Sequence, residues 1–414
     1  MLQLLIISDD FTGALDTGIQ FRGKHTALRF GQAPDSYLNG LGPDTQVLVV
    51  DAETRHLAPD KAAAIVGQIV ADAVAVGVEC IYKKTDSGLR GNIGAELAAA
   101  LEQSGEQILH FVPALPQLNR ITKNGIHYID GQEVADSVFG RDPFEPVCDS
   151  KVADIIARQS DVKVTTISDG GIPSAGIAVY DAETQADLEC IAQSLYAREQ
   201  TKLLAGCAGF ANALHQIIQR KIEDDPPPEL PWKLVTICGS INPITIKQMD
   251  MAEQANVPRV RLTNRQKLND GWMFTPDWYQ DVEEMEQLFK DHTNVIVECD
   301  GLGDPEGLAA CRKKLSMDLD QMRRTISQTM GSLLKKFLED GAKATWMVTG
   351  GDTLMAFMEL AGLHEMTPIC EYVPGVVLTS VHFKGDTVYL LTKSGGFGED
   401  TLLLDLEKKL KRQS

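Results

Sequence analysis

The sequence lacks the patterns that would tie it to a membrane, to secretion or to a structural metal. Its eight cysteines form no C-x-x-C pair, which argues against a zinc site and a disulfide framework and favours a reducing cytoplasm. No apolar run approaches the length needed to span a bilayer. The apolar N-terminal stretch has no basic flank and no cleavage site, so we predict a β-strand there and not a signal peptide.

Several short functional motifs are also missing. The 414 residues contain no G-x-G-x-x-G dinucleotide fingerprint, no G-x-x-x-x-G-K-[ST] phosphate loop, no H-E-x-x-H zinc motif and no G-x-S-x-G nucleophile elbow. The eight histidines are isolated, and we assign them no metal role. Any site for phosphate or nucleotide must therefore be built in another way.

Positive charge is in short supply. The chain has 39 basic and 58 acidic residues, for a net charge of −19 at pH 7. Such a surface disfavours nucleic acid and anionic membranes as partners, and solubility alone accounts for most of the excess. If the chain binds an anionic metabolite, its basic residues must be concentrated at the site. Lys83, Lys84 and Arg90 lie together in one short loop.

Short β-like runs alternate with helical stretches along the chain. Residues 2–8, 45–54 and 79–86 are predicted to be strands. Residues 60–77 and 93–105 are predicted to be helices, because their apolar residues recur at helical spacing. This rhythm predicts a mostly parallel sheet that is covered by helices on both faces.

An acidic, proline-rich segment divides the chain. We expect an N-terminal domain of residues 1–223, a linker of residues 224–232 and a C-terminal domain of residues 233–414. The predicted fold class is α/β, with two domains that are each a mostly parallel sheet flanked by helices, and with the active site in the cleft between them. In such sheets ligands bind at the carboxyl ends of the strands, so the residues that follow each strand are the candidates.

Two aspartates follow the first strand, in the stretch SDDFTGALDTG. Paired carboxylates can bind substrate hydroxyls, orient a magnesium ion or accept a proton from an attacking hydroxyl. An Asp in this place also caps the next helix. We predict that capping explains one of Asp9 and Asp10 and that function explains the other. Arg55 follows another strand and suits a carboxylate, although from its spacing alone a surface ion pair is the better interpretation.

The stretch KKTDSGLRGNIGAEL (83–97) combines charge with glycine. Arg90 and one of the two lysines would supply positive charge for an anion, and Asp86 is a further candidate general base. The alternative is a capped turn in which Lys83 and Lys84 point into solvent.

The same stretch leads into a helix. Gly91, Asn92 and Gly94 would let the backbone approach a ligand at the helix start, where N–H groups favour an anion. Beyond it, residues 120–146 contain an Asn-Gly turn and an Asp-Gly turn, which predict a β-hairpin. The hairpin is either a flap over the site or a plain structural element.

The loops of the second half are rich in glycine and hydroxyl groups. One Gly-Gly turn is a weak signal, but three loops of this kind after strands in one domain predict backbone N–H groups placed near phosphates. The candidate nucleotide-binding residues are Ser240, Gly350, Gly351, Asp352, Thr353, Gly395 and Gly396.

Eight stretches of the chain closely resemble, in the same order, the motifs of the four-carbon acid sugar kinase (tetronate kinase) family. They are DDFTGALDTG, ETR, KKTDSGLRGNIGAEL, PALPQLNR, RDPFEPV, GSINPIT, TGGDT and KSGGFG. The resemblance covers nearly the whole chain. It implies a kinase that uses ATP and Mg²⁺ to phosphorylate the 4-hydroxyl of a tetronate, with D-threonate or D-erythronate favoured and a 3-oxo-tetronate or another small sugar acid as the alternative. It also implies an N-terminal sugar-acid domain and a C-terminal nucleotide domain.

The resemblance also assigns residues. The acid pocket would be lined by Asp9, Asp10, Arg55, Lys83, Asp86, Arg90 and Asn92, and ATP would be held by Ser240, Gly350, Gly351, Asp352, Thr353 and Gly396. One of the three aspartates would accept the hydroxyl proton, and a basic residue would pair with the carboxylate of the acid. Two positions depart from the family pattern, because Asn119 stands where Gly is expected and Gly88 where many relatives have Thr.

Two other classes remain open from the residues alone: a NAD-dependent hydroxy-acid dehydrogenase and a non-catalytic protein that binds a sugar acid. The partners that we expect are the sugar acid and ATP, in the cytoplasm, with no nucleic acid, no membrane and no metal held by the protein itself. Assembly into a homo-oligomer is left open.

Overall fold

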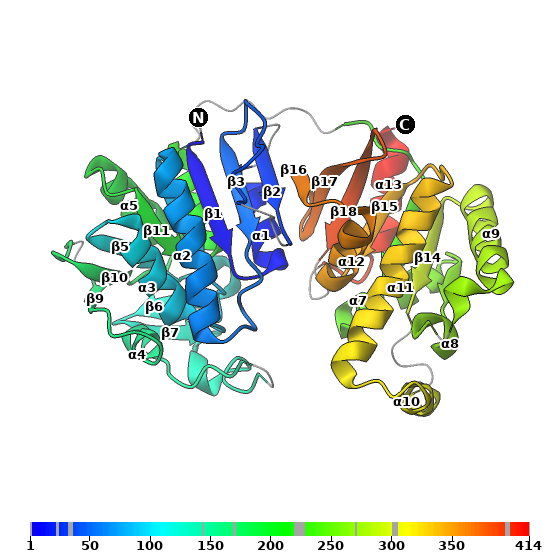
Figure 1. Ribbon diagram of the computed structural model, residues 1–414, viewed down its shortest axis with the longest axis horizontal. Helices are drawn as coiled ribbons and strands as arrows, with labels where there is room; N and C mark the ends of the chain where they lie inside the picture. The colour runs from blue at the N-terminus through cyan, green and yellow to red at the C-terminus, as the bar shows by residue number, and fades with distance from the viewer. Residues whose placement is uncertain are drawn as a thin grey trace. The chain divides into compact units, whose positions relative to one another are not determined.

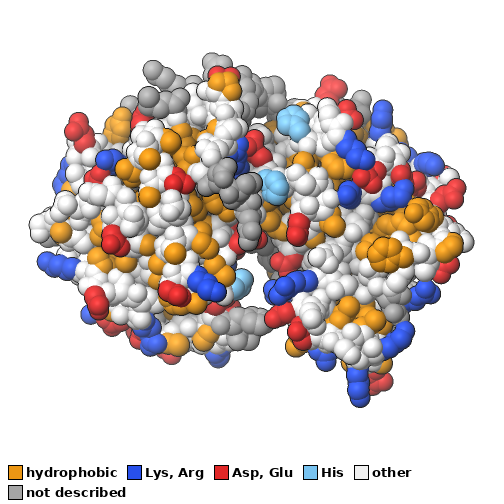
Figure 2. Space-filling model, in the orientation of Figure 1, with side chains coloured by type: hydrophobic (Ala, Val, Ile, Leu, Met, Phe, Trp, Pro, Cys, Tyr) orange, Lys and Arg blue, Asp and Glu red, His pale blue; other side chains and the backbone are white. Residues whose placement is uncertain are grey.

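The computed structural model describes residues 2–21, 25–31, 36–142, 145–168, 171–218, 228–269, 271–299, 305–393 and 398–413. The chain divides into two compact units, residues 1–225 (unit 1) and 226–414 (unit 2), and each is described by itself. In these ranges no helix is both long enough and apolar enough to cross a membrane. Acidic and basic side chains are interspersed over the visible surface of both units (Figure 2).

Unit 1 is built on a parallel sheet (Figure 1). Its strands are β1 (Leu4–Ser8), β2 (Thr26–Arg29), β3 (Val47–Asp51), β4 (Cys80–Lys84), β5 (Ile108–Val112), β9 (Val164–Ile167), β10 (Gly176–Tyr180) and β11 (Leu203–Gly206). They lie in the order β2-β3-β1-β4-β11-β5-β10-β9, and each neighbouring pair is parallel. Ser8 is level with both Asp51 and Lys84, so β1, β3 and β4 end side by side.

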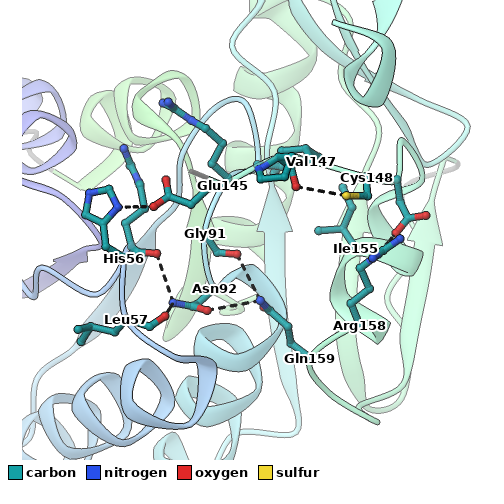
Figure 3. A pocket seen from close by; sticks show the side chains of 15 residues that line it. His56, Leu57, Gly91, Asn92, Glu145, Val147, Cys148, Ile155, Arg158 and Gln159 are labelled. Carbon is teal, nitrogen blue, oxygen red and sulfur yellow. Dashed lines mark hydrogen bonds and ion pairs between the residues drawn. The ribbon is translucent and has the colours of Figure 1, made fainter. Parts of the chain in front are cut away.

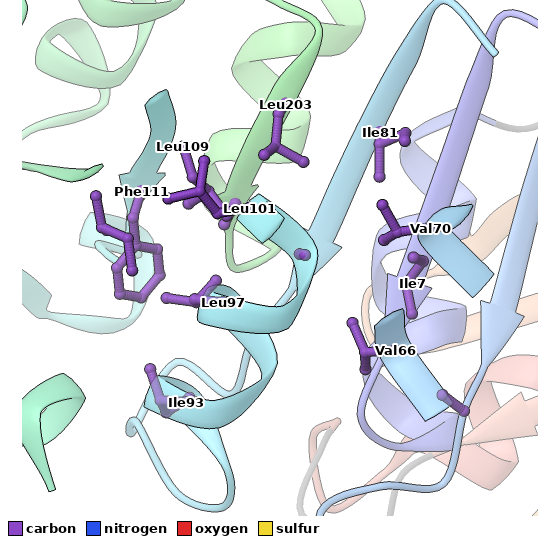
Figure 4. Close-up of a cluster of buried hydrophobic side chains, with 14 of the residues drawn as sticks. Ile7, Val66, Val70, Ile81, Ile93, Leu97, Leu101, Leu109, Phe111 and Leu203 are labelled. Atoms are coloured by element: carbon purple, nitrogen blue, oxygen red, sulfur yellow. The ribbon is translucent and has the colours of Figure 1, made fainter. Parts of the chain in front are cut away.

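Helices cover this sheet. They are α1 (Phe11–Gly18), α2 (Pro59–Val76), α3 (Ile93–Ser104), α4 (Val152–Ala157), α5 (Gln185–Ala197) and α6 (Ala208–Ile218). α2 and α3 pack side by side on one face, and α1 and α5 both contact α6. The core lies between α2, α3 and the sheet, where Val66 and Val70 of α2 and Leu97 of α3 meet Ile7 and Ile81 of the strands (Figure 4).

The fold class predicted from the sequence is confirmed in this unit, and so are its elements. The strands expected at 2–8, 45–54 and 79–86 are β1, β3 and β4. The helices expected at 60–77 and 93–105 are α2 and α3, which both end at a left-handed glycine. The expected linker, 224–232, lies partly outside the described residues.

The predicted hairpin is also present. It consists of β6 (Arg120–Lys123), β7 (Ile126–Ile129) and β8 (Gln132–Glu133), which form a small antiparallel sheet. Asn124 and Gly125 join the first two strands with φ angles of 53° and 73°. Positive φ at both central residues is the requirement of a tight hairpin turn, and Asn-Gly meets it at low cost.

Unit 2 has a mixed sheet. Its strands are β12 (Leu234–Cys238), β13 (Arg259–Arg261), β14 (Asn294–Glu298), β15 (Thr345–Thr349), β16 (Glu365–Val373), β17 (Val376–Phe383) and β18 (Asp386–Lys393). In the order β13-β14-β12-β15-β18-β17-β16, the pairs up to β18 are parallel and the last two are antiparallel. β12, β15 and β18 are neighbours, so the loops that follow them lie at one edge.

The helices of unit 2 cover that sheet. They are α7 (Pro243–Gln254), α8 (Asn264–Lys267), α9 (Pro276–Asp291), α10 (Pro305–Lys314), α11 (Leu319–Glu339), α12 (Gly351–Ala361) and α13 (Leu402–Gln413). α11 packs along α12, and α7 packs against α13. Leu234, Met347 and Leu391, from the three neighbouring strands, lie in one buried cluster with Met249 of α7 and Leu406 of α13.

Candidate active site

Five of the predicted residues form one ion-pair network at the carboxyl edge of the sheet of unit 1. Arg55 is its centre: its Nε lies 2.7 Å from Asp9 Oδ2, its Nη1 lies 2.8 Å from Asp10 Oδ2, and its Nη2 lies 3.9 Å from Asp86 Oδ1. Arg90 joins the network through Asp86. The residues meet because they follow β1, β3 and β4, which end side by side. Arg55 is only 9% exposed, so the surface ion pair favoured by its spacing is wrong.

The two aspartates after β1 have different roles. Asp10 is the N-cap of α1, and its Oδ1 accepts a hydrogen bond from the Gly13 N–H at 3.0 Å. The prediction that one of the pair caps the helix is therefore confirmed. Asp9 is buried, and its Oδ1 has no hydrogen-bond partner among the described residues. Asp10 keeps 26% of its side chain exposed and is the more accessible of the two.

The electrostatic surroundings also separate the two aspartates. Burial raises the pKa of Asp10, and the negative charge of Asp9 raises it further, against the opposing charges of Arg55 and Lys84. Burial acts in the same direction on Asp9, but the positive charges of Arg55, Lys83 and Lys84 outweigh it and hold the pKa of Asp9 below its usual value. Asp10 is therefore the better proton acceptor of the two.

Asp86 is fully engaged by hydrogen bonds. Its carboxylate accepts the Nε (2.8 Å) and Nη2 (3.1 Å) of Arg90, together with the backbone N–H groups of Gly88 and Arg90. Burial favours the neutral acid, but the hydrogen bond from Arg90 and the charge of Arg55 hold the pKa of Asp86 well below its usual range. A carboxylate held in this way is a poor base. Arg90 is in turn held by Asp142, whose Oδ2 lies 3.2 Å from its Nη1.

The two lysines at the end of β4 are buried, so the alternative in which they point into solvent is wrong. Successive side chains of a strand point to opposite faces. Lys83 points toward α3, where its Nζ lies 2.8 Å from Glu96 Oε2. Lys84 points toward α1, because a Cβ built on Gly13 would lie 2.5 Å from the Lys84 Nζ.

The predicted anion site at the start of α3 is filled by the protein itself. The N–H groups of Gly94 and Ala95 donate to Gln159 Oε1 at 2.9 and 3.3 Å. Asn92 donates through Nδ2 to the carbonyl oxygens of Thr54 and Leu57, so it holds the loop after β3. No signal in the sequence indicates Gln159, which is 65 residues from Gly94 along the chain but adjacent in the fold.

Gly91 and Gly94 are needed for packing. Gly91 has a φ of 85°, and a Cβ there would lie 3.1 Å from Arg55 Cγ. A Cβ on Gly94 would lie 2.3 Å from the backbone oxygen of Ile156, at the crossing of α3 and α4. Both glycines therefore allow close approach of other parts of the protein, where the sequence had suggested approach of a ligand.

A cavity of about 320 Å³ opens beside this network (Figure 3). Four predicted residues line it: Arg55, Arg90, Gly91 and Asn92. The rest of its wall comes from the loop at His56 and Leu57, from Leu89, from residues 145–149, and from Ile155, Arg158 and Gln159. His56 pairs with Glu145, and Arg158 pairs with Asp149. The cavity is large enough for a four-carbon acid, but the aspartates lie outside its wall.

The hairpin contacts the loop that contains Asp86. The His127 ring lies within hydrogen-bond distance of the Ser87 carbonyl oxygen, at 2.9 Å, and Arg120 bonds to the Ser87 hydroxyl. Burial lowers the pKa of His127 to about 4, so its ring is neutral at pH 7. The hairpin therefore holds the loop that contains Asp86 in place, a role that its sequence left open.

Both departures from the family pattern have a structural reason. Asn119 has a φ of 52°, a left-handed conformation that Asn tolerates nearly as well as Gly. A Cβ on Gly88 would lie 2.5 Å from the ring of Phe139, so the ring occupies the space of a side chain there. The guanidinium groups of Arg90 and Arg120 lie 5.1 and 5.0 Å from the centre of the same ring.

In unit 2, the loops after β12 and β15 meet at the candidate nucleotide site. A Cβ on Gly239 would lie 2.0 Å from Thr353 Oγ1, and one on Gly350 would lie 3.6 Å from the Ser240 N. Gly350 has a φ of 103° and begins α12 without a side-chain cap, whereas Asn242 caps α7. Among the described residues, the first N–H groups of α12, from Gly351 onward, therefore have no side-chain acceptor, and they suit an anion.

The remaining predicted residues of unit 2 differ in their surroundings. Asp352 is exposed and lies 3.5 Å from Arg323 across the surface. Gly395 and Gly396 lie outside the described residues. Lys393 ends β18, donates through Nζ to Thr245 Oγ1 at 2.9 Å, and has its pKa lowered to about 8 by burial. Within the described residues, no group of three or more His, Cys, Asp or Glu side chains could hold a metal ion.

Comparisons with known proteins cover both units. A family model described as a sugar-binding N-terminal domain matches residues 4–214, and one described as a nucleotide-binding C-terminal domain matches residues 235–403. A D-threonate kinase of Salmonella typhimurium is 28% identical, over 98% of this chain and 97% of its own. A D-erythronate kinase of Heliobacterium modesticaldum is 25% identical, over 90% and 89%. A 3-oxo-tetronate kinase of Brucella melitensis is 25% identical, over 98% and 95%.

A solved structure has the same fold. The crystal structure of a Haemophilus influenzae protein superposes with a TM-score of 0.76, covers 98% of this chain and 99% of its own, and is 20% identical.

Proposed function

Because the chain belongs to the four-carbon acid sugar kinase (tetronate kinase) family, we propose that it transfers the γ-phosphoryl group of ATP to the 4-hydroxyl of a four-carbon sugar acid. D-threonate or D-erythronate is the favoured acceptor, and a 3-oxo-tetronate is the alternative. The observation that carries the proposal is the similarity, along nearly the whole chain, to relatives that are named for this reaction.

The chemistry of unit 1 supports the acceptor half of the proposal. Asp10 accepts the proton of the 4-hydroxyl, since its pKa is raised, its side chain is partly exposed and Arg55 holds it in place. Asp9 and Asp86 hold the two arginines, and neither has the combination of access and raised pKa that a base needs. Among the three aspartates that the sequence leaves open, Asp10 is therefore the base that we propose.

The chemistry of unit 2 supports the donor half. The phosphates of ATP bind the uncapped start of α12, where Gly350 to Thr353 supply backbone N–H groups. Bound magnesium supplies charge neutralisation to the β- and γ-phosphates.

The reaction balances without a further reactant. The oxygen of the 4-hydroxyl forms a bond to the γ-phosphorus as the bond from that phosphorus to the β,γ-bridging oxygen breaks. The electron pair of the broken bond remains on ADP, and the hydroxyl proton passes to Asp10. Because such transfers depend mainly on positioning and charge neutralisation, the fixed Asp10–Arg55 pair is of direct use to the reaction.

The test is a coupled assay of ADP release with MgATP and a panel of acids: D- and L-threonate, D- and L-erythronate and the 3-oxo-tetronates. Asp10→Asn should abolish most of the turnover, and Asp60→Asn, at an exposed position of α2, should leave it unchanged. Turnover of one acid supports the kinase and names its substrate. No ADP release with any acid contradicts the proposal, and a thermal shift with NAD but not with MgATP would favour the dehydrogenase instead.

A further inference from the structure

Four basic side chains surround the aspartates of unit 1, and three of them are engaged by carboxylates. Arg55 is paired with Asp9 and Asp10, Arg90 with Asp86 and Asp142, and Lys83 with Glu96. Their positive charge is already balanced by the protein. They have little charge left for an anionic ligand.

Lys84 is the exception. It is 5% exposed, and within the described residues its Nζ has neither a hydrogen bond nor an ion pair. An ammonium group that is largely shielded from water gains from an anionic partner, and a bound anion would supply one here. Its charge nevertheless acts on Asp9, Asp10 and Asp86, since it lowers the pKa of each.

The position of Lys84 indicates which ligand completes it. The Nζ lies over the first turn of α1, because a Cβ on Gly13 would lie 2.5 Å from it and 2.6 Å from Asp10 Oδ1. The positive end of the helix and the ammonium group therefore face the same point. A Cβ at position 13 would collide with both atoms, so only glycine leaves room for the ammonium group over the start of the helix. The arrangement favours a multiply charged anion beside Asp10.

We propose that Lys84, together with the first turn of α1, binds the phosphoryl group while it passes from ATP to the acid. This inference rests on the proposed function and assigns one residue to its reacting centre. Asp10 receives the proton of the 4-hydroxyl, so Lys84 beside it lies at the same end of the substrate. The carboxylate of the acid lies at the other end of the four-carbon chain, away from the hydroxyl that reacts.

The distinction between phosphoryl group and carboxylate is measurable. A cation that acts on the transferring group stabilises the transition state more than the bound acid, so its loss lowers kcat and leaves the KM of the acid unchanged. Lys84→Met should lower kcat by about 10²–10³-fold, the usual effect of removing one preorganised charge or donor. Lys84→Arg should recover part of it. Lys202→Met is the matched control, because that lysine is 59% exposed and pairs with Glu106 on the surface.

A binding experiment tests the site without turnover. Inorganic phosphate should raise the melting temperature of the wild type and of Lys202→Met, and part of this shift should be absent in Lys84→Met and restored in Lys84→Arg. Urea unfolding checks that the variants are folded. Equal shifts in all four proteins would overturn the proposal, and so would a Lys84→Met enzyme in which only the KM of the acid rises. If phosphate protection depends on Lys84 but no acid is turned over, the anion site stands and the proposed function fails.

Discussion

Asp10 has two separate functions in one side chain, because it caps α1 and is the proposed base. Asn is as good a cap as Asp but accepts no proton at neutral pH. We therefore predict that Asp10→Asn lowers kcat by about 10²–10⁴-fold with little loss of stability. Steady-state kinetics and urea unfolding of the same preparation measure the two effects. A kcat close to that of the wild type would show that Asp10 serves only as a cap.

The raised pKa of Asp10 predicts an acid limb in the activity. The base must be deprotonated, so kcat/KM should fall as the pH drops through a pKa above the ordinary 3.8 of an aspartate. The pKa of Asp10 is raised because burial and the negative charge of Asp9 both favour the protonated form of its carboxyl group. The pH profile of kcat/KM, taken from neutral pH downward, checks this. A flat profile down to the ordinary aspartate value would argue against Asp10.

The buried pair of Lys83 and Glu96 should be structural. Removal of one partner leaves an uncompensated buried charge, so Lys83→Met or Glu96→Leu should each cost about 3–5 kcal/mol of unfolding free energy. The double variant, with two apolar side chains of similar volume, should recover most of that loss. Urea denaturation of the four proteins gives the comparison. If the double variant loses as much unfolding free energy as the two single variants together, the pair contributes more than charge balance.

At the residue scale, the sequence indicates which residues gather but not what each does there. One rule identifies the residues of the network: polar residues that follow neighbouring parallel strands lie close together. They are Asp9, Asp10, Arg55, Asp86 and Arg90. Their partners are not found, because pairing depends on the direction of each side chain. Lys83 and Lys84 are adjacent and identical in type. Strand alternation nevertheless gives Lys83 a carboxylate on α3 and turns Lys84 toward α1, where no described residue pairs with it.

At the scale of elements, the crossing of α3 and α4 requires Gly94. A Cβ there meets backbone, which yields less than a flexible side chain, so Gly94→Ala should cost about 1–3 kcal/mol. Gly67→Ala in α2 is the matched control. Its Cβ would lie 3.2 Å from the Cγ of the flexible Gln103 side chain and 3.8 Å from the Cβ of Ala99. Ala also favours the helix by about 1 kcal/mol. Thermal or urea unfolding should therefore show opposite signs for the two substitutions. Two losses of equal size would contradict the role of the crossing.

Elements with strong periodicity are predicted well from the sequence, and those set by tertiary contacts are not. The apolar residues of α2 and α3 recur at helical spacing, and both helices end at a glycine. The turn residues Asn124 and Gly125 predict the hairpin. The anion site expected at the start of α3 was misplaced. Gln159 fills it from a distant part of the chain, which the local pattern of residues does not reveal.

At the scale of the whole molecule, the net charge of −19 should oppose folding through self-repulsion. Sodium chloride screens that repulsion, so raising the ionic strength to about 0.15 M should raise the melting temperature at pH 7. The effect should shrink near pH 4.8, where the net charge approaches zero. Thermal melts at both pH values check this. An equal salt effect at both would point to specific ion binding and away from self-repulsion.

The division of chemistry between the halves is also predicted from the sequence at this scale. Charged loops follow the strands of unit 1, and glycine loops follow the strands of unit 2. The structure adds physical reasons for both: an ion-pair network of arginines and aspartates in the first, and an uncapped helix start in the second. What the sequence does not give is the mixed character of the second sheet, whose strands β16 and β17 are antiparallel.

The strand order of unit 1 has a consequence for its synthesis. β11 lies between β4 and β5, although it comes from residues 203–206 and its two neighbours come from residues 80–84 and 108–112. A nascent chain on the ribosome therefore holds both flanking strands long before the one that joins them. The middle of the sheet closes only when nearly all of the unit has emerged, and until then two strand edges need protection from other nascent chains.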